Sequence, residues 1–559
     1  MNLRAFLHGR FAAAFGTAGA VGAEPMIGAA TRAEFGDYQA NGAMAAAKQA
    51  QTQPRVLASA VVEALEDVDF ARSVTVEGPG FINITLSPAF VGEQLRQVEI
   101  DQTGCPDTIV VDYSSPNLAK EMHVGHLRTT IGDAMVRVLE ALGHRVIRQN
   151  HVGDWGTQFG MLVAHLEDVR EDAPELRDLE VFYAAARKRF DADPAFADRA
   201  RHTVVALQGG DERVREYWQR FVDISLSHCR AVYDTLGITL ADKDLDAESR
   251  YNDDLPSVIT DLESAGLVTV DDGAKCVFLD ELETPLIVQK RDGGYLYATT
   301  DLAAVRYRSA HYRADRILYF VDSRQTLHFR QLFAVARKAG FANESCTLEH
   351  HPFGAIMGRD NRPFKTRSGD VVKLSDLLDE AVRRARALVT EKSPELGEKE
   401  ADLIARVVGI GAVKYADVSK HRASDYVFDW DAMLNLDGNT APYLQYAYAR
   451  IQSLFRRGGV DPAALAEAPV ISNETERRLG VALLRFQETL ERVASEALPH
   501  YLSGYLYGLA GDFMKFYETC PVLDAPGALR DHRLKLCALT GETLKRGLGL
   551  LGIETVDRM

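Results

Sequence analysis

The spacing of apolar residues changes twice along the chain, which predicts three regions. The first region, residues 1–105, combines helical patterns at 1–20 and 43–66 with two strand-like runs, SVTVEG and FINITL. This mixture predicts a small α+β domain. The segment before Glu24 holds no acidic residue, as in a transit peptide, but its apolar stripe favours the first helix of this domain.

In the second region, residues 106–375, short β-branched runs alternate with helical stretches. This alternation predicts an α/β domain in which helices flank a parallel sheet. A charged stretch near 165–220 has no strand pattern and is predicted to be a helical insertion. The β-branched runs are TIVVDY, HRVIRQNHVG, TPLIVQK and RILYFVD.

The third region, residues 376–559, is helical in pattern throughout. Helix breakers at Gly458-Gly459, Pro469, Pro499 and Pro521 divide it into segments of ordinary helix length. We therefore predict an all-α C-terminal region that includes a helical bundle at about 438–559.

Composition narrows the functional class. The 559 residues are 46% hydrophobic and 26% charged, as in soluble globular proteins, and no apolar run reaches the roughly 18 residues that cross a bilayer. The six cysteines form no C-x-x-C pair, so we predict neither disulfides nor a zinc site. Scattered thiols of this kind also predict a cytoplasmic location.

Charge argues against a protein that coats nucleic acid indiscriminately, because the net charge is −16. The acidic excess lies in the middle of the chain. Residues 1–60 hold five basic and three acidic residues, and the last 120 residues hold fourteen of each. The two ends are therefore better suited than the centre to contact a polyanion.

The run TIVVDY leads through a Pro-Asn turn into HVGHLRTTIGD, a strand–loop–helix pattern. Ligands of parallel sheets bind at this kind of junction, where a helix N-terminus attracts anions. His123 and His126 would share a helical face, Gly125 would let a flat ring approach, and Lys120 would add a mobile charge. The pattern predicts an ATP site; the alternative is an incidental pair of histidines on a capped helix.

HVGH resembles the HIGH signature of class I aminoacyl-tRNA synthetases. Five further blocks, together with the run VVDYSSPNLAKEMHVGHLRTTIGD, are similar to arginyl-tRNA synthetases in particular. The resemblance implies a Rossmann-like catalytic domain, an N-terminal domain that contacts tRNA, and a helical anticodon-binding domain. The five blocks are NHVGDWGTQFG, DGGYLYATTDLAA, VDSRQTLH, VGIGAVKYADVSKHR and DGNTAPYLQYAYARI.

The resemblance also implies an ATP site. Lys120, His123 and His126 are the expected catalytic residues. The second class signature, a lysine-rich loop, matches RPFKTRSGDVVKL at 362–374, where Pro363 and Thr366 replace its usual lysines. Lys120 is expected to compensate for that loss. The expected ATP-binding residues are Pro116, His123, Gly125, His126, Lys365 and Arg367.

The implied amino-acid substrate is arginine, whose guanidinium calls for planar recognition by carboxylates. Tyr297 and Asp301 are four residues apart and would share one helical face, although a tyrosine beside an aspartate can also be a structural cap. Two acids, Asp112 and Asp301, facing one guanidinium would reject analogues without an editing domain. The expected arginine-binding residues are Asp112, Ser115, Asn117, His126, Tyr297, Asp301 and Gln325.

The implied reaction forms arginyl-adenylate from L-arginine and MgATP, with tRNA(Arg) expected to be required, and then charges that tRNA. Rings and guanidinium groups in GNTAPYLQYAYARIQS suit stacking on unpaired bases, although aromatic residues at helical spacing are often core. We expect a monomer with no membrane association. The expected tRNA-binding residues are Tyr443, Gln445, Tyr446 and Arg450.

Three other functions share parts of this pattern. A cysteinyl-tRNA synthetase would need a zinc-ligating cysteine and histidine set, which the sequence lacks. A small nucleotidylyltransferase would leave the helical third of the chain unexplained. An RNA-binding scaffold with an inactive synthetase fold would not be expected to keep His123, Gly125, His126 and Asp301 together.

Overall fold

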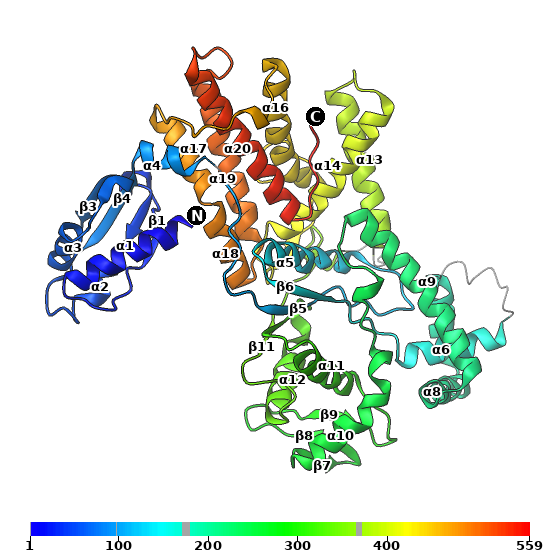
Figure 1. Ribbon diagram of the computed structural model, residues 1–559. Helices are drawn as coiled ribbons and strands as arrows, with labels where there is room; N and C mark the ends of the chain where they lie inside the picture. The colour runs from blue at the N-terminus through cyan, green and yellow to red at the C-terminus, as the bar shows by residue number, and fades with distance from the viewer. Residues whose placement is uncertain (1, 97, 170–178, 365–371) are drawn as a thin grey trace. The chain divides into compact units, whose positions relative to one another are not determined.

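The computed structural model describes residues 2–96, 98–169, 179–364 and 372–559. Contacts divide the chain into two compact units, Met1–Gln102 with Asn435–Met559, and Thr103–Leu434 (Figure 1). This division differs from the predicted boundaries at 105 and 375. The helices that follow residue 374, up to Leu434, belong to the same unit as the parallel sheet.

A four-stranded parallel sheet is the centre of the second unit, with strand order β11-β10-β5-β6. Asp112 at the end of β5 is paired with Tyr319 on one side and Gln149 on the other, so the strands end at a common edge. Three of the four β-branched runs form this sheet, as predicted. The strands are β5 (Thr108–Asp112), β6 (Arg145–Gln149), β10 (Arg316–Tyr319) and β11 (Thr347–His350).

The fourth run, TPLIVQK, does not join the parallel sheet. It forms β9 (Leu286–Gln289) in a separate antiparallel sheet with β7 (Val268–Asp271) and β8 (Ala274–Val277). The prediction for this run was wrong because three strands close together along the chain can pair as hairpins, and apolar runs alone do not reveal the partner.

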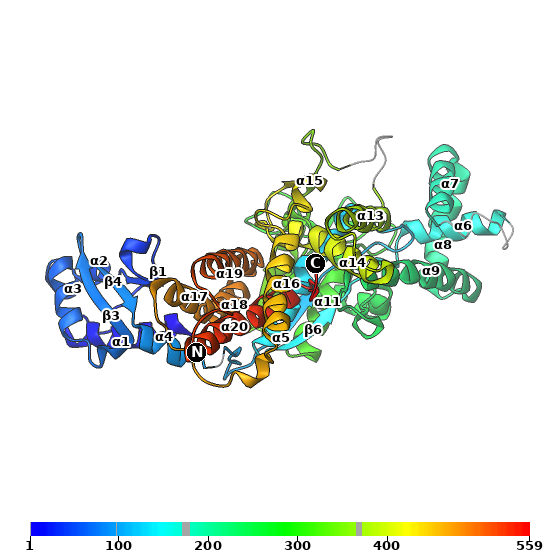
Figure 2. The same cartoon turned by 90° about the horizontal axis from the view of Figure 1, so that it is seen from above.

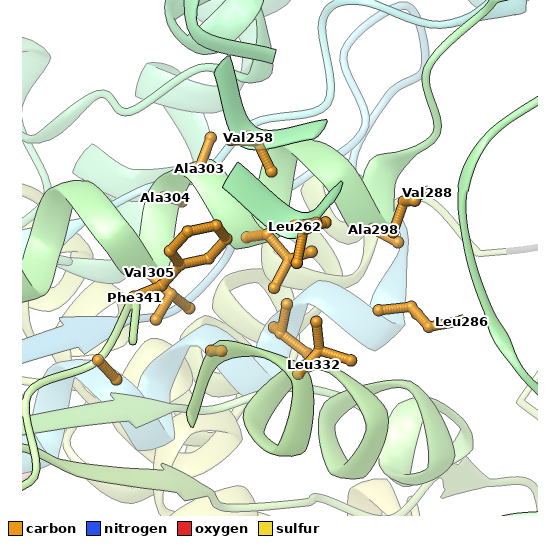
Figure 3. Packing of buried hydrophobic residues seen from close by; sticks show 14 of the residues in the cluster. Val258, Leu262, Leu286, Val288, Ala298, Ala303, Ala304, Val305, Leu332 and Phe341 are labelled. Carbon is orange, nitrogen blue, oxygen red and sulfur yellow. The ribbon is translucent and has the colours of Figure 1, made fainter. Parts of the chain in front are cut away.

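Helix α11 (Tyr297–His311) packs against α10 (Leu255–Ser264), α12 (Thr326–Lys338) and β9. Their buried side chains form one apolar cluster, in which each is 6% exposed or less (Figure 3). Close packing of this kind holds α11 in a defined position beside the sheet. The labelled members are Val258, Leu262, Leu286, Val288, Ala298, Ala303, Ala304, Val305, Leu332 and Phe341.

The segment predicted as a helical insertion is helical throughout its described part. Its four helices pack on one another and lie to one side of the parallel sheet in both views (Figures 1 and 2). Asp193 and Asp211 cap two of them by accepting backbone N–H bonds. The helices are α6 (Thr157–Asp168), α7 (Leu179–Ala192), α8 (Pro194–Gly209) and α9 (Glu212–Leu236).

Three helices complete the second unit: α13 (Leu374–Lys392), α14 (Glu398–Val418) and α15 (Trp430–Met433). Helix α14 is tied to α5 (Thr129–Ala141) by a buried ion pair, in which Arg128 Nη1 lies 2.9 Å from Asp417 Oδ1. The Thr130 hydroxyl also donates to Asp417, at 2.7 Å. The second unit therefore continues past residue 376.

Strands do not vanish entirely after residue 375, contrary to the prediction. The two-residue strand β13 (Tyr426–Val427) pairs in parallel with β12 (Ile356–Met357). A pair this short has too few alternating positions to be recognised from sequence.

The other unit contains the N-terminal α+β domain. Its antiparallel sheet has the order β1-β2-β4-β3, and the SVTVEG and FINITL runs pair as predicted. The helical pattern at 43–66 is two helices rather than one, because Pro54 begins the second of them at its first position. The elements are α1 (Leu3–Thr17), β1 (Ile27–Ala29), β2 (Tyr38–Ala40), α2 (Ala43–Ala46), α3 (Pro54–Glu63), β3 (Ala71–Glu77), β4 (Phe81–Leu86) and α4 (Pro88–Gln94).

The predicted helical bundle forms the rest of this unit. Gly459 caps its first helix in the left-handed conformation, and Pro499 precedes its fourth. No helix in the described part of the chain is long and apolar enough to span a bilayer. The bundle helices are α16 (Ala441–Gly458), α17 (Glu474–Leu484), α18 (Phe486–Glu496), α19 (His500–Thr519) and α20 (Ala528–Leu550).

Leu332→Ala is expected to lower the free energy of unfolding of the sheet-containing unit by about 2–5 kcal/mol, because the substitution leaves a cavity in a closed core. Leu327 lies on the same helix but is 47% exposed, so Leu327→Ala should change this free energy by less than about 0.5 kcal/mol. Urea unfolding of both variants, followed by circular dichroism, measures the difference. Equal shifts would show that the cluster does not stabilise α12.

Candidate active site

The Ser-Ser-Pro loop after β5 turns sharply into the cleft. Ser114 and Ser115 both adopt positive φ angles, 73° and 45°, which non-glycine residues rarely do. Neighbouring side chains hold this turn, since Ser115 N–H donates to Asn150 Oδ1 at 3.0 Å and Ser114 Oγ lies 2.7 Å from Tyr233 OH. Such backbone strain concentrates at functional sites, where the surrounding structure enforces it.

The next residues of this loop pair with the segment that follows β6. Gly153 N–H donates to the Pro116 carbonyl at 3.1 Å, and Leu118 N–H donates to the Gly153 carbonyl at 3.0 Å. A Cβ added to Gly153 would lie only 2.3 Å from Asn117 Oδ1. Glycine is therefore required at residue 153 for Asn117 to take its place at the cleft.

The two histidines of HVGH lie side by side, with ring centroids 4.2 Å apart. The helix begins later than predicted: His123 is the N-cap of a short 3-10 helix, η3 (Val124–Arg128), which leads into α5. A Cβ on Gly125 would lie 2.7 Å from the His123 ring. The space we had assigned to a ligand ring at Gly125 is thus needed by the histidine itself.

Backbone hydrogen bonds determine which nitrogen of the His123 ring carries the proton. Gly125 N–H donates to His123 Nδ1 at 3.0 Å, and because a backbone N–H can only donate, the neutral His123 ring carries its proton on Nε2. His126 Nδ1 lies 3.0 Å from the His123 N–H and 3.2 Å from the His123 carbonyl oxygen, so its contacts fit both tautomers. His123 can therefore donate one Nε2–H bond.

Both rings are neutral at physiological pH. Burial, and next the neighbouring His123, lower the pKa of His126 to about 4. The pKa of His123 is also lowered, first by burial and then by the positive charges of Arg324 and Lys120. Uncharged donors at a helix start can bind phosphate oxygens without a proton change.

Lys120 lies apart from this pair. Its Nζ lies 4.7 Å from the centroid of the Tyr183 ring on α7, and Lys120 is not among the described residues that line the cleft. Lys365 and Arg367 lie outside the described residues, so their surroundings stay untested.

The chain that follows the lysine-rich loop returns directly to the histidine motif. Val124 N–H donates to the Val372 carbonyl and Leu374 N–H donates to the Met122 carbonyl, both at 2.9 Å. This backbone pairing joins the end of the second signature segment to the start of the first.

Asp112 already has a guanidinium partner within the chain. Its Oδ2 lies 2.7 Å from Nη1 of Arg308, and its Oδ1 accepts the Ser115 hydroxyl at 2.7 Å. Arg308 is 1% exposed and its Nη2 lies 2.9 Å from Asp246 Oδ2. We had expected Asp112 and Asp301 to face one substrate guanidinium, but Asp112 lines the cleft with its charge already paired to Arg308.

Asp301 and Tyr297 share one face of α11, as predicted from their spacing. Both contact His328: Asp301 Oδ2 lies 2.7 Å from its Nε2, and the Tyr297 and His328 ring centroids are 4.9 Å apart. Burial alone would raise the pKa of Asp301, but contacts with His151 and His328 outweigh it and lower that pKa. Asp301 is therefore a charged carboxylate at neutral pH.

One cleft of about 1220 Å³ brings most of the predicted residues together. Pro116 and Lys120 are not among its described lining residues. Tyr297, 59% exposed, and the exposed Gln325 lie where a ligand can reach them. The predicted residues that line the cleft are Asp112, Ser115, Asn117, His123, Gly125, His126, Tyr297, Asp301 and Gln325.

Sequence reasoning missed several other lining residues, among them His151, Glu248, Arg324 and His328. Burial raises the pKa of Glu248 to about 7. His151 and His328 lie in sequence blocks that carried the family resemblance, so they could have been proposed from that signal. No sequence pattern pointed to Glu248.

The helical bundle presents an aromatic face on α16 and α19. Tyr446 is 38% exposed, and the Arg450 guanidinium lies 5.7 Å from its ring centroid and 4.7 Å from that of Tyr517. The rings of Tyr443 and Tyr507 lie 5.6 Å apart. We call these five residues the aromatic face.

Gln445 does not belong to a binding surface. It is completely buried, and its Nε2 donates to the Glu554 carbonyl at 2.8 Å. The prediction that Gln445 contacts RNA is therefore wrong in this structure, because the neighbouring segments of the bundle cover this side of α16.

Three family models match the chain in succession. They are described as "Arginyl tRNA synthetase N terminal domain" over residues 5–86, "tRNA synthetases class I (R), catalytic domain" over 90–430, and "DALR anticodon binding domain" over 444–559. Together these models match most of the sequence.

Curated relatives match over their whole length. The arginine–tRNA ligases of Cellvibrio japonicus and Laribacter hongkongensis are each 53% identical to this chain, with 100% of both chains covered. Among solved structures, the arginyl-tRNA synthetase of Plasmodium falciparum is similar with a TM-score of 0.89 at 28% identity, covering 100% of this chain and 99% of the other. That of Thermus thermophilus has a TM-score of 0.84 at 26% identity, with 100% of both chains covered. The chain belongs to the arginyl-tRNA synthetases, a family of class I aminoacyl-tRNA synthetases.

Proposed function

We propose that this chain activates L-arginine with ATP and transfers it to the 3′ end of tRNA(Arg). The observation that carries this proposal is that two chemically different kinds of group line one cleft. The charged carboxylate of Asp301 lines it, and so do the uncharged imidazoles of His123 and His126 at the start of a helix. A cationic side chain and an anionic triphosphate are the ligands that suit these groups.

In the proposed arginine pocket, Asp301 accepts hydrogen bonds from the substrate guanidinium. Tyr297 and Gln325 lie beside it in the cleft and can bond the remaining guanidinium N–H groups or exclude water from them. Ser115 and Asn117 complete the pocket from the strained loop. Asp112 contributes by orienting Ser115, because it accepts a hydrogen bond from the Ser115 hydroxyl at 2.7 Å.

In the proposed ATP site, His123 and His126 donate to phosphate oxygens. We also assign Pro116 and Gly125 to this site, from their positions in the first signature segment. Arg324, whose side chain is 87% exposed, lines the same cleft, where it is paired with Asp322 at 2.7 Å. We also assign Lys365 and Arg367 to this site, from their positions in the second signature segment.

In the first step a carboxylate oxygen of arginine attacks the α-phosphorus of MgATP. The bond from the α-phosphorus to the bridging oxygen breaks, and pyrophosphate leaves with that oxygen. In the second step a ribose hydroxyl of the tRNA attacks the carbonyl carbon, gives up its proton, and releases AMP. Catalysis is then positioning together with stabilisation of phosphate charge, with no covalent enzyme intermediate.

A catalytic role for Lys120 requires it to move. Its ammonium group rests on the Tyr183 ring, an arrangement that holds a cation by electrostatic attraction to the ring face. In our proposal Lys120 leaves Tyr183 and reaches the phosphates when both substrates and tRNA are bound.

The proposed anticodon contact is the aromatic face, where exposed rings and a guanidinium can stack on unpaired bases. We propose a monomeric enzyme of the cytoplasm. Its six cysteines are all free thiols, which suits a reducing compartment.

ATP–pyrophosphate exchange with each of the twenty amino acids tests the proposed function. Exchange is expected with arginine alone, and only when tRNA(Arg) is present, because we propose that tRNA completes the site. Exchange with a different amino acid would refute the assignment. Arginine-dependent exchange in the absence of tRNA would refute only the tRNA requirement.

Asp301→Asn should raise the KM for arginine by roughly 10- to 150-fold, because it removes the charge from a hydrogen bond worth about 1.5–3 kcal/mol. The KM for ATP should stay unchanged. Aminoacylation kinetics measure both values, with Asp271→Asn as the control, since Asp271 is an exposed acid on β7 outside the described cleft lining. An unaltered KM for arginine in Asp301→Asn would remove Asp301 from the pocket.

Tyr446→Ala should weaken tRNA(Arg) binding by about 1–3 kcal/mol, the value of one base stacked on an aromatic ring. Filter binding or fluorescence titration with the tRNA gives the Kd. Tyr501→Ala is the matched control, because Tyr501 lies at the start of α19 and is engaged by Arg492 and Glu496. Equal losses in the two variants would show that the aromatic face makes no special contact.

A further inference from the structure

His151 lies between two carboxylates at the floor of the cleft. Its Nδ1 is 3.6 Å from Asp246 Oδ2 and its Nε2 is 3.5 Å from Asp301 Oδ1. The side chain is only 11% exposed, and neither ring nitrogen has a closer hydrogen-bond partner among the described residues. Only an imidazolium, protonated on both ring nitrogens, can donate a hydrogen bond to the carboxylate on each side.

The two acids are not equivalent partners. Asp246 is completely buried and already accepts bonds from Arg308 at 2.9 Å and from the Tyr251 hydroxyl at 2.9 Å. Among the described residues, Asp301 has His328 as its one other close partner, at 2.7 Å, and its side chain is 21% exposed. A ligand can therefore reach the Asp301 side of His151 but not the Asp246 side.

Protonated His151 places one positive charge between the carboxylates of Asp246 and Asp301. A substrate guanidinium at Asp301 would bring a second positive charge to the same carboxylate, and like charges repel strongly in low-dielectric surroundings. Loss of the His151 proton would remove that repulsion.

We propose that the substrate guanidinium and the proton on His151 compete for Asp301, so that arginine binding expels the proton to solvent. His151 is thus a positioning residue that acts through Asp301, and it couples arginine affinity to pH. This inference rests on the proposed arginine pocket. It also adds to the selectivity for arginine. A neutral ureido analogue cannot displace the proton, so Asp301 would stay paired with His151 and would not bind the analogue.

The titratable groups around His151 support this direction. Burial alone would lower the pKa of His151, but its contacts with Asp246 and Asp301 outweigh it and raise that pKa well above the usual value. A bound guanidinium would lower this pKa again by repulsion across Asp301. The charged and titratable groups that face His151 are Asp154, Asp246, Glu248, Tyr251, Asp301 and Arg308.

The sign of the pH dependence follows from this coupling. Between the lowered pKa of the bound state and the raised pKa of the free state, the free enzyme holds the proton and the complex does not. Arginine binding in that range should release up to one proton, and the Kd for arginine should rise as pH falls, by as much as tenfold per pH unit.

Calorimetric titration of the full-length enzyme with L-arginine, in two buffers of different ionisation enthalpy, counts the released protons. We expect release in the wild type and none in His151→Gln, which keeps a hydrogen-bonding side chain but cannot titrate. His144→Gln is the matched control, because His144 precedes β6 and His151 follows it. This control should release protons as the wild type does.

Three outcomes would overturn the proposal: arginine binding to the wild type without proton release, release that persists in His151→Gln, or release lost equally in His144→Gln. Persistent release that disappears in Glu248→Gln would assign the proton to Glu248 instead. The wild-type measurement needs no variant, so a poorly folded His151→Gln leaves the test intact. If Asp301→Asn does not weaken arginine binding, the proposed arginine pocket is wrong. If Asp301→Asn does weaken arginine binding but the wild type releases no proton, only the proposed role of His151 is wrong.

Discussion

The buried guanidinium of Arg308 is the interaction on which the cleft depends. It is 1% exposed and joins Asp112, at the end of β5, to Asp246, in the segment before the 3-10 helix η6 (Glu248–Asp254). A charge at this depth is tolerated only when it is paired and hydrogen-bonded, so α11 cannot shift without exposing an unpaired charge. Arg308 therefore holds in place the helix that also carries Asp301.

Two kinds of group line the cleft, and different elements carry them. Helix α11 carries Asp301, and the HVGH turn carries His123 and His126. The Gly125 N–H leaves His123 with its proton on Nε2, and burial keeps His126 neutral. One cleft thus offers a carboxylate to a cation and neutral imidazoles to an anion.

The fold was largely predictable from local sequence patterns, and the errors in that prediction have physical causes. The runs at β5 and β10 were recognisable because buried parallel strands read as continuous apolar segments. The run at β9 has the same appearance but pairs as a hairpin with β8, and only the partner strand decides that. Pro54 shows the converse, since one proline was enough to divide a helical pattern that we had read as continuous.

The sequence by itself determined the motifs and the order of most elements, because these depend on residue types at short spacings. The family resemblance supplied the predicted site residues, nine of which line the cleft. Only the tertiary structure decided which charges meet. Asp112, His151 and Asp246 lie far along the chain from α11, which carries both Asp301 and Arg308, and these charges meet only in the folded chain. The same holds for Gln445, which the bundle buries while it leaves Tyr446 exposed, because burial is set by neighbouring helices and not by local sequence.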